Sequence, residues 1–266
     1  HGRRSLRRWR TTTEATRSPW PHAGHVAARY HVDVGCANAT RPQPRPQPRP
    51  RRPIATMERV TPRELVVLTV ALVALLVWSG IRPYDRLTWF MEVLPVIVAL
   101  PVMWATWRRF PLTDILYAGI FVHCCVLMLG GAYTYARVPM GFALQEWFDT
   151  ARNPYDKIGH FMQGFVPALL AREILIRGAF VRGRRMLAFL VICVVMAVSA
   201  TYELIEWAAA LSLGQGADEF LGTQGDPWDT QSDMFLALLG AVTALVLLSR
   251  RHDREIGKLE ARTAAT

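Results

Sequence analysis

Charged residues are scarce in this sequence: they make up 20% of its 266 residues, whereas hydrophobic residues make up 52%. Acidic residues are scarcer than basic ones, 21 against 31, which gives a formal net charge of +10. The surplus is confined to residues 1–56, which contain twelve Arg and two acidic residues, so residues 57–266 carry no net charge. A neutral, apolar body excludes a soluble nucleic-acid-binding domain, and we expect no nucleic-acid partner.

Cysteine is also scarce, and its four positions argue against a disulfide framework. Cys36 lies in the basic N-terminal segment, Cys124 and Cys125 are adjacent in one apolar run, and Cys193 lies in another. Since none of them falls in an outer loop, we expect no structural disulfide. We interpret them as small buried hydrophobic residues.

The N-terminal segment, residues 1–56, lacks hydrophobic periodicity and contains a run of Arg, Pro and Gln at residues 41–53. Such a segment buries too little apolar surface to offset its ordering entropy, so we expect it to be disordered or polyproline-like. It lacks the order of regions typical of a signal peptide. The first Met is Met57. We expect either that the working protein begins there or that residues 1–56 form a basic cytoplasmic arm that touches anionic lipid.

Long apolar runs dominate the rest of the chain. A helix needs about 20 residues to cross a bilayer, and six runs come near this length, of which the fourth is the most polar. They lie at residues 63–81, 89–107, 113–133, 157–176, 187–210 and 231–249. We therefore predict an all-α polytopic bundle of six transmembrane helices over residues 57–250, followed by a charged cytoplasmic tail at residues 251–266.

The charges of the loops predict the orientation of these helices. Basic clusters follow the second, fourth and sixth runs, at residues 108–109, 177–185 and 250–251, which the positive-inside rule assigns to the cytoplasm. Residues 214–228 contain acidic but no basic residues and suit the outer face. Both termini are then inside. Residues 139–152 have helical amphipathic spacing and predict a short interfacial helix that roofs the outer side.

Ionisable residues inside the apolar runs are candidate functional groups, because they are costly in lipid. A fifth helix that enters near Leu187 places Glu203 about 24 Å along its axis, near the outer face where the fourth and sixth helices begin. We expect four such residues to converge there: His160, Glu203, Glu206 and Asp233. As a catalytic hypothesis, Glu203 or Glu206 is a general base, His160 a proton donor and Asp233 an orienting group. The alternative is a structural hydrogen bond between helices.

The fourth and sixth runs open with the same pattern, Asn153-Pro-Tyr-Asp156 and Asp226-Pro-Trp-Asp229. This pattern predicts structural caps at Asn153, Asp156, Asp226 and Asp229. Two helix N-termini at the outer face also suit an anion such as a phosphate headgroup.

A divalent metal such as Zn²⁺ or Mn²⁺ is a possible cofactor, although the spacing matches no specific motif. Its candidate ligands are His160, Glu203, Asp229 and Asp233. For His123, in the third run, we expect a hydrogen-bonded packing role. We expect Arg172 and Glu173, near the inner end of the fourth run, to form a satisfied pair.

Three segments together are similar to the YjdF-like family of bacterial inner-membrane proteins: Tyr-Asp-Lys-Ile-Gly-His-Phe at 155–161, Tyr-Glu-Leu-Ile-Glu-Trp at 202–207, and Gly-Asp-Pro-Trp-Asp-Thr-Gln-Ser-Asp-Met at 225–234. The resemblance covers about residues 57–250. More distantly, the same regions resemble the VanZ-like membrane proteins, which are associated with glycopeptide resistance. Neither family has an established reaction, so the resemblance implies a fold and a compartment rather than a chemistry.

The sequence thus predicts an integral protein of the bacterial cytoplasmic membrane with an outward-facing His/carboxylate pocket. We expect membrane lipids as partners, and a lipid-linked, envelope or anionic ligand that the pocket binds or acts on. One alternative is a small proton- or ion-coupled transporter, because buried Glu and His side chains also form proton relays. Another is a structural or assembly factor.

Overall fold

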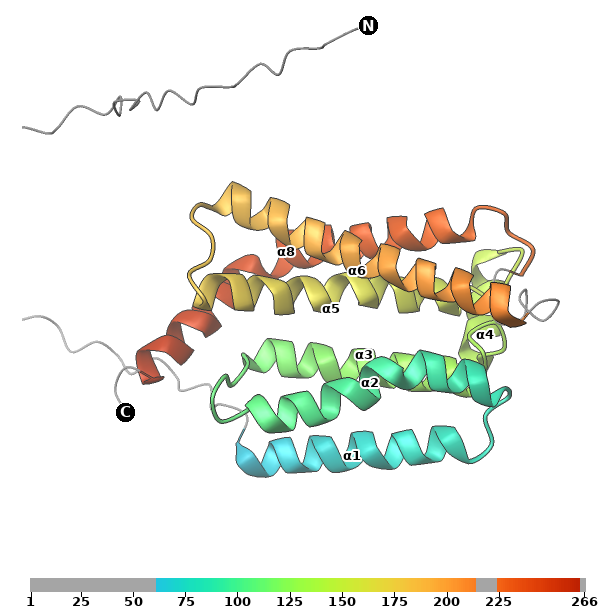
Figure 1. Ribbon diagram of the computed structural model, residues 1–266, viewed down its shortest axis with the longest axis horizontal. Coiled ribbons are helices and arrows are strands. Elements are labelled where there is room, and N and C mark those ends of the chain that lie inside the picture. The colour runs from blue at the N-terminus through green and yellow to red at the C-terminus, as the bar shows by residue number, and fades with distance from the viewer. Residues whose placement is uncertain (1–60, 214–223, 264–266) are drawn as a thin grey trace, which may run out of the picture. The chain divides into compact units, whose positions relative to one another are not determined.

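The computed structural model describes residues 61–213 and 224–263, which form seven helices (Figure 1). The N-terminal segment, including Met57, and the acidic residues Asp218 and Glu219 lie outside the described residues. The helices are α1 (Pro62–Ile81), α2 (Arg86–Thr106), α3 (Asp114–Ala132), α4 (Pro139–Phe148), α5 (Tyr155–Arg177), α6 (Arg184–Leu213) and α8 (Asp229–Thr263). The predicted all-α class is confirmed.

Local capping explains where the first two helices begin. Thr61 and Glu64 form a reciprocal capping box at the start of α1, with Pro62 in the first turn. The carboxylate of Asp85 accepts a hydrogen bond of 2.7 Å from the backbone amide of Thr88 at the start of α2. This bond lowers the pKa of Asp85 below its usual value.

Two helix ends differ from the predicted boundaries. The amphipathic helix α4 ends at Phe148, because Asp149 adopts a left-handed conformation with φ of 49°. In contrast, α8 continues to Thr263, through residues predicted as a charged tail. Ile256 and Leu259 of this extension are buried, so one face of the charged segment packs against the protein and sustains the helix.

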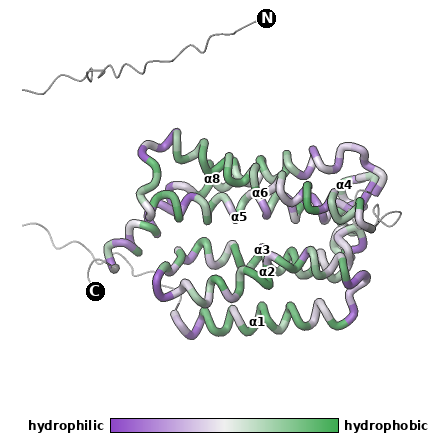
Figure 2. Tube along the Cα trace, viewed as in Figure 1, coloured by the Kyte–Doolittle hydropathy of each residue, from purple (hydrophilic) through white to green (hydrophobic). Residues whose placement is uncertain are grey.

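Five of the described helices, α1, α2, α3, α6 and α8, are long and apolar enough to cross a membrane. α5 has 23 residues, a similar length, but it is more polar, as its mixed colouring in Figure 2 shows. It runs alongside α6 and α8 and packs against α3, α6 and α8 (Figure 1). We count α5 as the sixth span, because the surrounding helices shield its polar residues from lipid.

The closest helix pair in the bundle is α5 with α8, and two glycines permit its close approach. A Cβ added at Gly164 would overlap the backbone carbonyl oxygen of Ala237, and one at Gly240 would overlap that of Phe161. Small residues at a helix interface allow this approach in membrane proteins. The main core forms around this pair, with fully buried Ala168 of α5 and Ala241 of α8 among its members.

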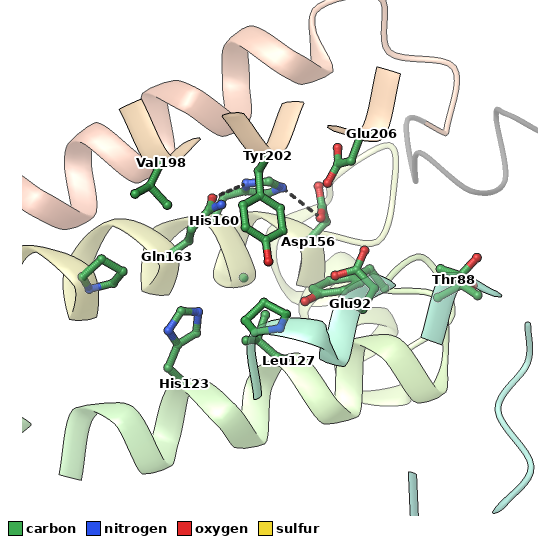
Figure 3. A pocket seen from close by; sticks show the side chains of 15 residues that line it. Thr88, Glu92, His123, Leu127, Asp156, His160, Gln163, Val198, Tyr202 and Glu206 are labelled. Atoms are coloured by element: carbon green, nitrogen blue, oxygen red, sulfur yellow. Dashed lines mark hydrogen bonds and ion pairs between the residues drawn. The ribbon is translucent and has the colours of Figure 1, made fainter. Parts of the chain in front are cut away.

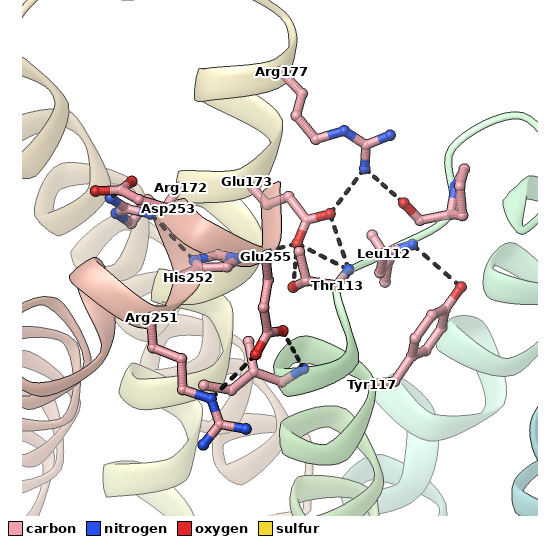
Figure 4. Close-up of polar contacts among 12 residues, drawn as sticks. Leu112, Thr113, Tyr117, Arg172, Glu173, Arg177, Arg251, His252, Asp253 and Glu255 are labelled. Carbon is pink, nitrogen blue, oxygen red and sulfur yellow. Dashed lines mark hydrogen bonds and ion pairs between the residues drawn. The ribbon is translucent and has the colours of Figure 1, made fainter. Parts of the chain in front are cut away.

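The C-terminal end of α5, which is predicted to be cytoplasmic and which we call the inner end, is tied to α3 and α8 through Glu173. This residue is fully buried (Figure 4). Its carboxylate accepts hydrogen bonds from the Thr113 hydroxyl (2.7 Å), from Arg177 Nη1 (2.8 Å) and from His252 Nε2 (3.0 Å). The Thr113 backbone amide donates to the same group. We call Glu173, Arg177, His252, Thr113 and Arg172 the inner network.

The prediction that Arg172 and Glu173 pair with each other is wrong. Arg172 lies on another side of α5, where it contacts Asp253 and the Nδ1 atom of His252 (3.3 Å). Adjacent residues on a helix do not face each other, so each finds partners on different neighbouring elements.

The cysteines described in the structure are free thiols. Cys124 is buried and Cys125 is partly buried, whereas Cys193 is exposed on α6, in contrast to its predicted burial. α6 carries apolar residues around more than one face, and Cys193 lies on the face turned away from the core.

The close packing of α5 on α8 predicts a strong effect of Gly164→Ala. The added methyl group must displace the α8 backbone, so we expect the free energy of unfolding in detergent to fall by about 1–3 kcal/mol. Gly257→Ala is the matched control, because a Cβ there meets nothing within 4 Å; it should be neutral or stabilise α8 by up to about 1 kcal/mol. Equal effects of the two variants would contradict the described contact.

Candidate functional site

Three helices bring ionisable side chains together at the end of the bundle where α5 and α8 begin. This is the end predicted to face outward, and we call it the outer end. His160 of α5 lies with its Nε2 atom 3.4 Å from Asp156 Oδ1 and 3.6 Å from Asp233 Oδ2 of α8. Its Nδ1 atom lies 4.0 Å from Glu203 Oε1 of α6. Asp233 is 2% exposed and Glu203 is 7% exposed, so the cluster is largely removed from solvent. The structure thus brings three of the four predicted catalytic residues into one place.

The spacing of polar residues along α5 explains this arrangement. Asp156, His160 and Gln163 are four and three residues apart, which puts them on one face of the helix. Gln163 Oε1 lies 3.0 Å from His160 Nδ1. Because an amide oxygen only accepts hydrogen bonds, Nδ1 is the donor, and Nε2 is left to face the two aspartates.

Several carboxylate oxygens of this cluster have no hydrogen-bond partner. They are Asp156 Oδ2, Asp233 Oδ1 and Glu203 Oε1, all of them buried atoms among the described residues. Buried polar atoms are normally hydrogen-bonded, and exceptions point to a missing ion, water or ligand. The cluster therefore has unused capacity to coordinate a positively charged species.

The residues predicted as caps surround the cluster on its outer side. Asn153 Oδ1 accepts from the Tyr155 backbone amide (3.0 Å), and Asp226 Oδ1 accepts from the Trp228 amide (2.9 Å). Asp156 and Asp229 lie in the first turns of α5 and α8, but their carboxylates are turned to other side chains. Asp156 faces His160, and Asp229 forms an ion pair with Arg152.

Arg152 joins the outer ends of α5 and α8. It pairs with Asp229 and, at 3.1 Å, with Asp226. Asn153 adds a second connection, because its backbone and the side-chain amide of Gln224 exchange two hydrogen bonds of 3.2 Å. These bonds fix where the first turn of α5 lies, and hence where Asp156 and His160 point.

A cavity of about 130 Å³ lies beside the cluster, between α2, α3, α5 and α6 (Figure 3). Glu206, the fourth predicted catalytic residue, lies on its α6 wall together with Tyr202. The cavity also extends inward to His123, near the middle of α3. The full lining is Thr88, Glu92, Pro95, His123, Leu127, Thr134, Tyr135, Asp156, Gly159, His160, Gln163, Pro167, Val198, Tyr202 and Glu206.

Glu92 of α2 is a lining residue that the sequence analysis missed. It is an acidic residue within an apolar run, so the criterion that selected Glu203 also applies to it. Its carboxylate lies near Tyr135, which is in the turn after α3 and also lines the cavity. Burial, together with the charge of Glu92, raises the pKa of Tyr135 well above its usual value.

His123 does not have the hydrogen-bonded packing role that the sequence predicted. Its buried Nε2 atom has no hydrogen-bond partner within the described part of the chain. Instead, the ring faces the cavity (Figure 3). The Nε2 atom is therefore available to a group in the cavity.

Comparison with known proteins agrees with this membrane architecture. A family model described as a predicted membrane protein, DUF2238, matches residues 64–254. The chain is also similar to the inner membrane protein YjdF of Escherichia coli (strain K12), with 61% identity over 198 residues, which is 74% of this chain and 95% of that protein. No solved structure matches significantly. The resemblance to YjdF is confirmed, and the more distant one to VanZ-like proteins stays a prediction.

We predict that Asn153→Ala lowers the stability of the protein, because Asn153 helps to hold the N-terminus of α5 in place. This side chain is 2% exposed and also donates a 3.1 Å hydrogen bond to the Val138 carbonyl. Its removal leaves buried backbone groups without partners, so we expect a loss of about 1–3 kcal/mol in unfolding free energy in detergent. Thr150→Ala, at an exposed site nearby, should change stability little; a similar loss there would count against this role of Asn153.

Proposed function

The chain belongs to the DUF2238 family of predicted membrane proteins, and we propose that its outer His/carboxylate pocket holds a divalent cation and, through it, binds a lipid-linked or envelope component. The protein is a multi-pass protein of the bacterial cytoplasmic membrane. The proposed cation ligands lie on α5 and α8, near the predicted outer face.

The observation that carries this proposal is the geometry around His160 Nε2. Metal–ligand bonds of about 2.0–2.2 Å in a tetrahedron place neighbouring ligand atoms about 3.3–3.6 Å apart. The Nε2 atom lies 3.4 Å from the Asp156 oxygen and 3.6 Å from the Asp233 oxygen, and ligand atoms of all three residues fall within 4.8 Å of one another. A histidine with two carboxylates suits Zn²⁺ or Mn²⁺.

The ligand set that the structure favours differs from the predicted one at a single position. Asp229 is engaged by Arg152, whereas Asp156 takes the place beside His160. Glu203 has a free buried oxygen near the ring and is suited to a fourth ligand or to orienting His160. The hydrogen bond from Nδ1 to Gln163 fixes the ring so that Nε2 faces the cation.

A bound cation would change which ligands the pocket accepts. Without it, the carboxylates repel a phosphate group; with it, the positive charge attracts and polarises one. Glu206 lies on the cavity wall and is the best-placed candidate for a general base if a reaction follows binding. The helix N-termini, which also favour anions, lie at the same end.

The inner network makes a transporter less consistent with the structure. A transported ion would need a path from the cavity to the inner face, where Glu173, His252 and Arg172 are buried and hydrogen-bonded. Opening such a path would break charged contacts in a medium of low polarity, which is costly. A binding protein or an enzyme requires no such opening.

Cation binding is tested by titrating Mn²⁺ and Zn²⁺ into the chelator-treated full chain in detergent by calorimetry. We expect one saturable site per chain, weakened at least about tenfold in Asp233→Asn and His160→Gln, since each loses a ligand. Glu146→Gln, at an exposed position on α4, should bind as the unaltered protein does. The proposal is refuted if no saturable binding is seen, or if all variants bind the cation with equal affinity.

A further inference from the structure

The cavity beside the cation site is acidic. Glu92 and Glu206 line it, next to Asp156 and His160 of the cation site, and no lysine or arginine is among its described lining residues. Buried carboxylates are stable only with a compensating charge or a proton. A bound group that carries a positive charge would compensate Glu92 and Glu206.

Acceptor atoms lie on opposite walls of the cavity. Glu92 belongs to α2, and Tyr135 lies near it in the lining. Glu206 and Tyr202 belong to α6, on the other side, and Figure 3 shows the Tyr202 hydroxyl directed into the space between them. Deeper in, the unpartnered Nε2 atom of His123 faces the same space. A ligand here meets acceptors from several directions.

The volume and the remaining lining of the cavity limit the size of the ligand that it can hold. A volume of about 130 Å³ corresponds to roughly ten water-sized positions. It therefore fits a small headgroup and excludes a whole lipid or sugar chain. Leu127, Val198 and Pro95 supply apolar surface for one or two methylene groups.

We propose that this cavity binds the primary ammonium group of a small amine, between Glu92 on α2 and Glu206 on α6. A primary ammonium has three N–H donors and one positive charge, which suit acceptors on separate walls. A quaternary ammonium has no donors and would leave these acceptors unpaired. The inference goes beyond the proposed function and does not depend on it, because Glu92 and Glu206 take no part in holding the divalent cation.

The first experiment uses ethanolammonium chloride as the probe, with sodium chloride and tetramethylammonium chloride at equal ionic strength as comparisons. Calorimetry on the full chain in detergent should show saturable binding of ethanolammonium alone. Glu92→Gln and Glu206→Gln keep the side-chain shape but remove the charge, and each should weaken binding at least about tenfold. Glu146→Gln, at an exposed position on α4, should bind normally.

The second experiment asks whether the amine belongs to a lipid or is free. The chain is placed in nanodiscs of phosphatidylglycerol with either phosphatidylethanolamine or phosphatidylcholine, and retained lipid is measured by native mass spectrometry. Retention of phosphatidylethanolamine that depends on Glu92 identifies a lipid headgroup. Binding of free ethanolammonium without such retention identifies a soluble amine. Either result supports the ammonium site.

Two further variants control for loss of fold and for loss of the cation site. Glu92→Asp retains the charge and should bind ethanolammonium within a few-fold of the unaltered protein, which separates loss of charge from loss of fold. Asp233→Asn should lose Mn²⁺ but retain ethanolammonium, so failure of the cation site and failure of the ammonium site are distinguishable. If neither ethanolammonium nor phosphatidylethanolamine binds, or if binding survives in both Glu→Gln variants, the inference is wrong.

Discussion

The burial of one polar helix, α5, is the constraint on which the rest of the structure depends. A helix that carries His160, Arg172 and Glu173 can cross hydrocarbon only where other helices cover these groups. α8 provides most of that cover, because Gly164 and Gly240 let the two backbones approach closely. The polar groups of α8 then meet those of α5 at both ends, Asp233 with His160 and His252 with Glu173.

The two ends of this helix pair differ in how far their polar atoms are satisfied. At the inner end Glu173 accepts hydrogen bonds from several groups, which is the arrangement expected of a structural contact. At the outer end Asp156, Glu203 and Asp233 each keep a buried oxygen without a partner, next to a cavity. Stability alone does not favour unpaired buried carboxylates, so the outer end is where a ligand is needed.

Hydropathy and helical rise predicted much of this arrangement from the sequence. The apolar runs predicted the spans, and counting residues through the fifth run placed Glu203 beside His160 and Asp233. What could not be predicted was the rotation of each helix about its axis. That rotation decides that Arg172 and Glu173 have different partners, and that Glu92 and His123 line the cavity. The sequence analysis also missed the extension of α8. Its charged composition predicted a tail, whereas the helix continues because Ile256 and Leu259 are buried against the protein.

The central claim is that α5 crosses the membrane with its outer half open to a polar cavity and its remaining length sealed by neighbouring helices. Substituted-cysteine labelling along α5 in intact cells tests it most directly, in a background without the native cysteines and with a membrane-impermeant thiol reagent. Gln163→Cys, on the cavity, should react from outside; fully buried Ala168→Cys should not react; exposed Arg182→Cys should react only after permeabilisation. Protection at position 163 with reaction at 168, or labelling of position 182 from outside, would contradict the account.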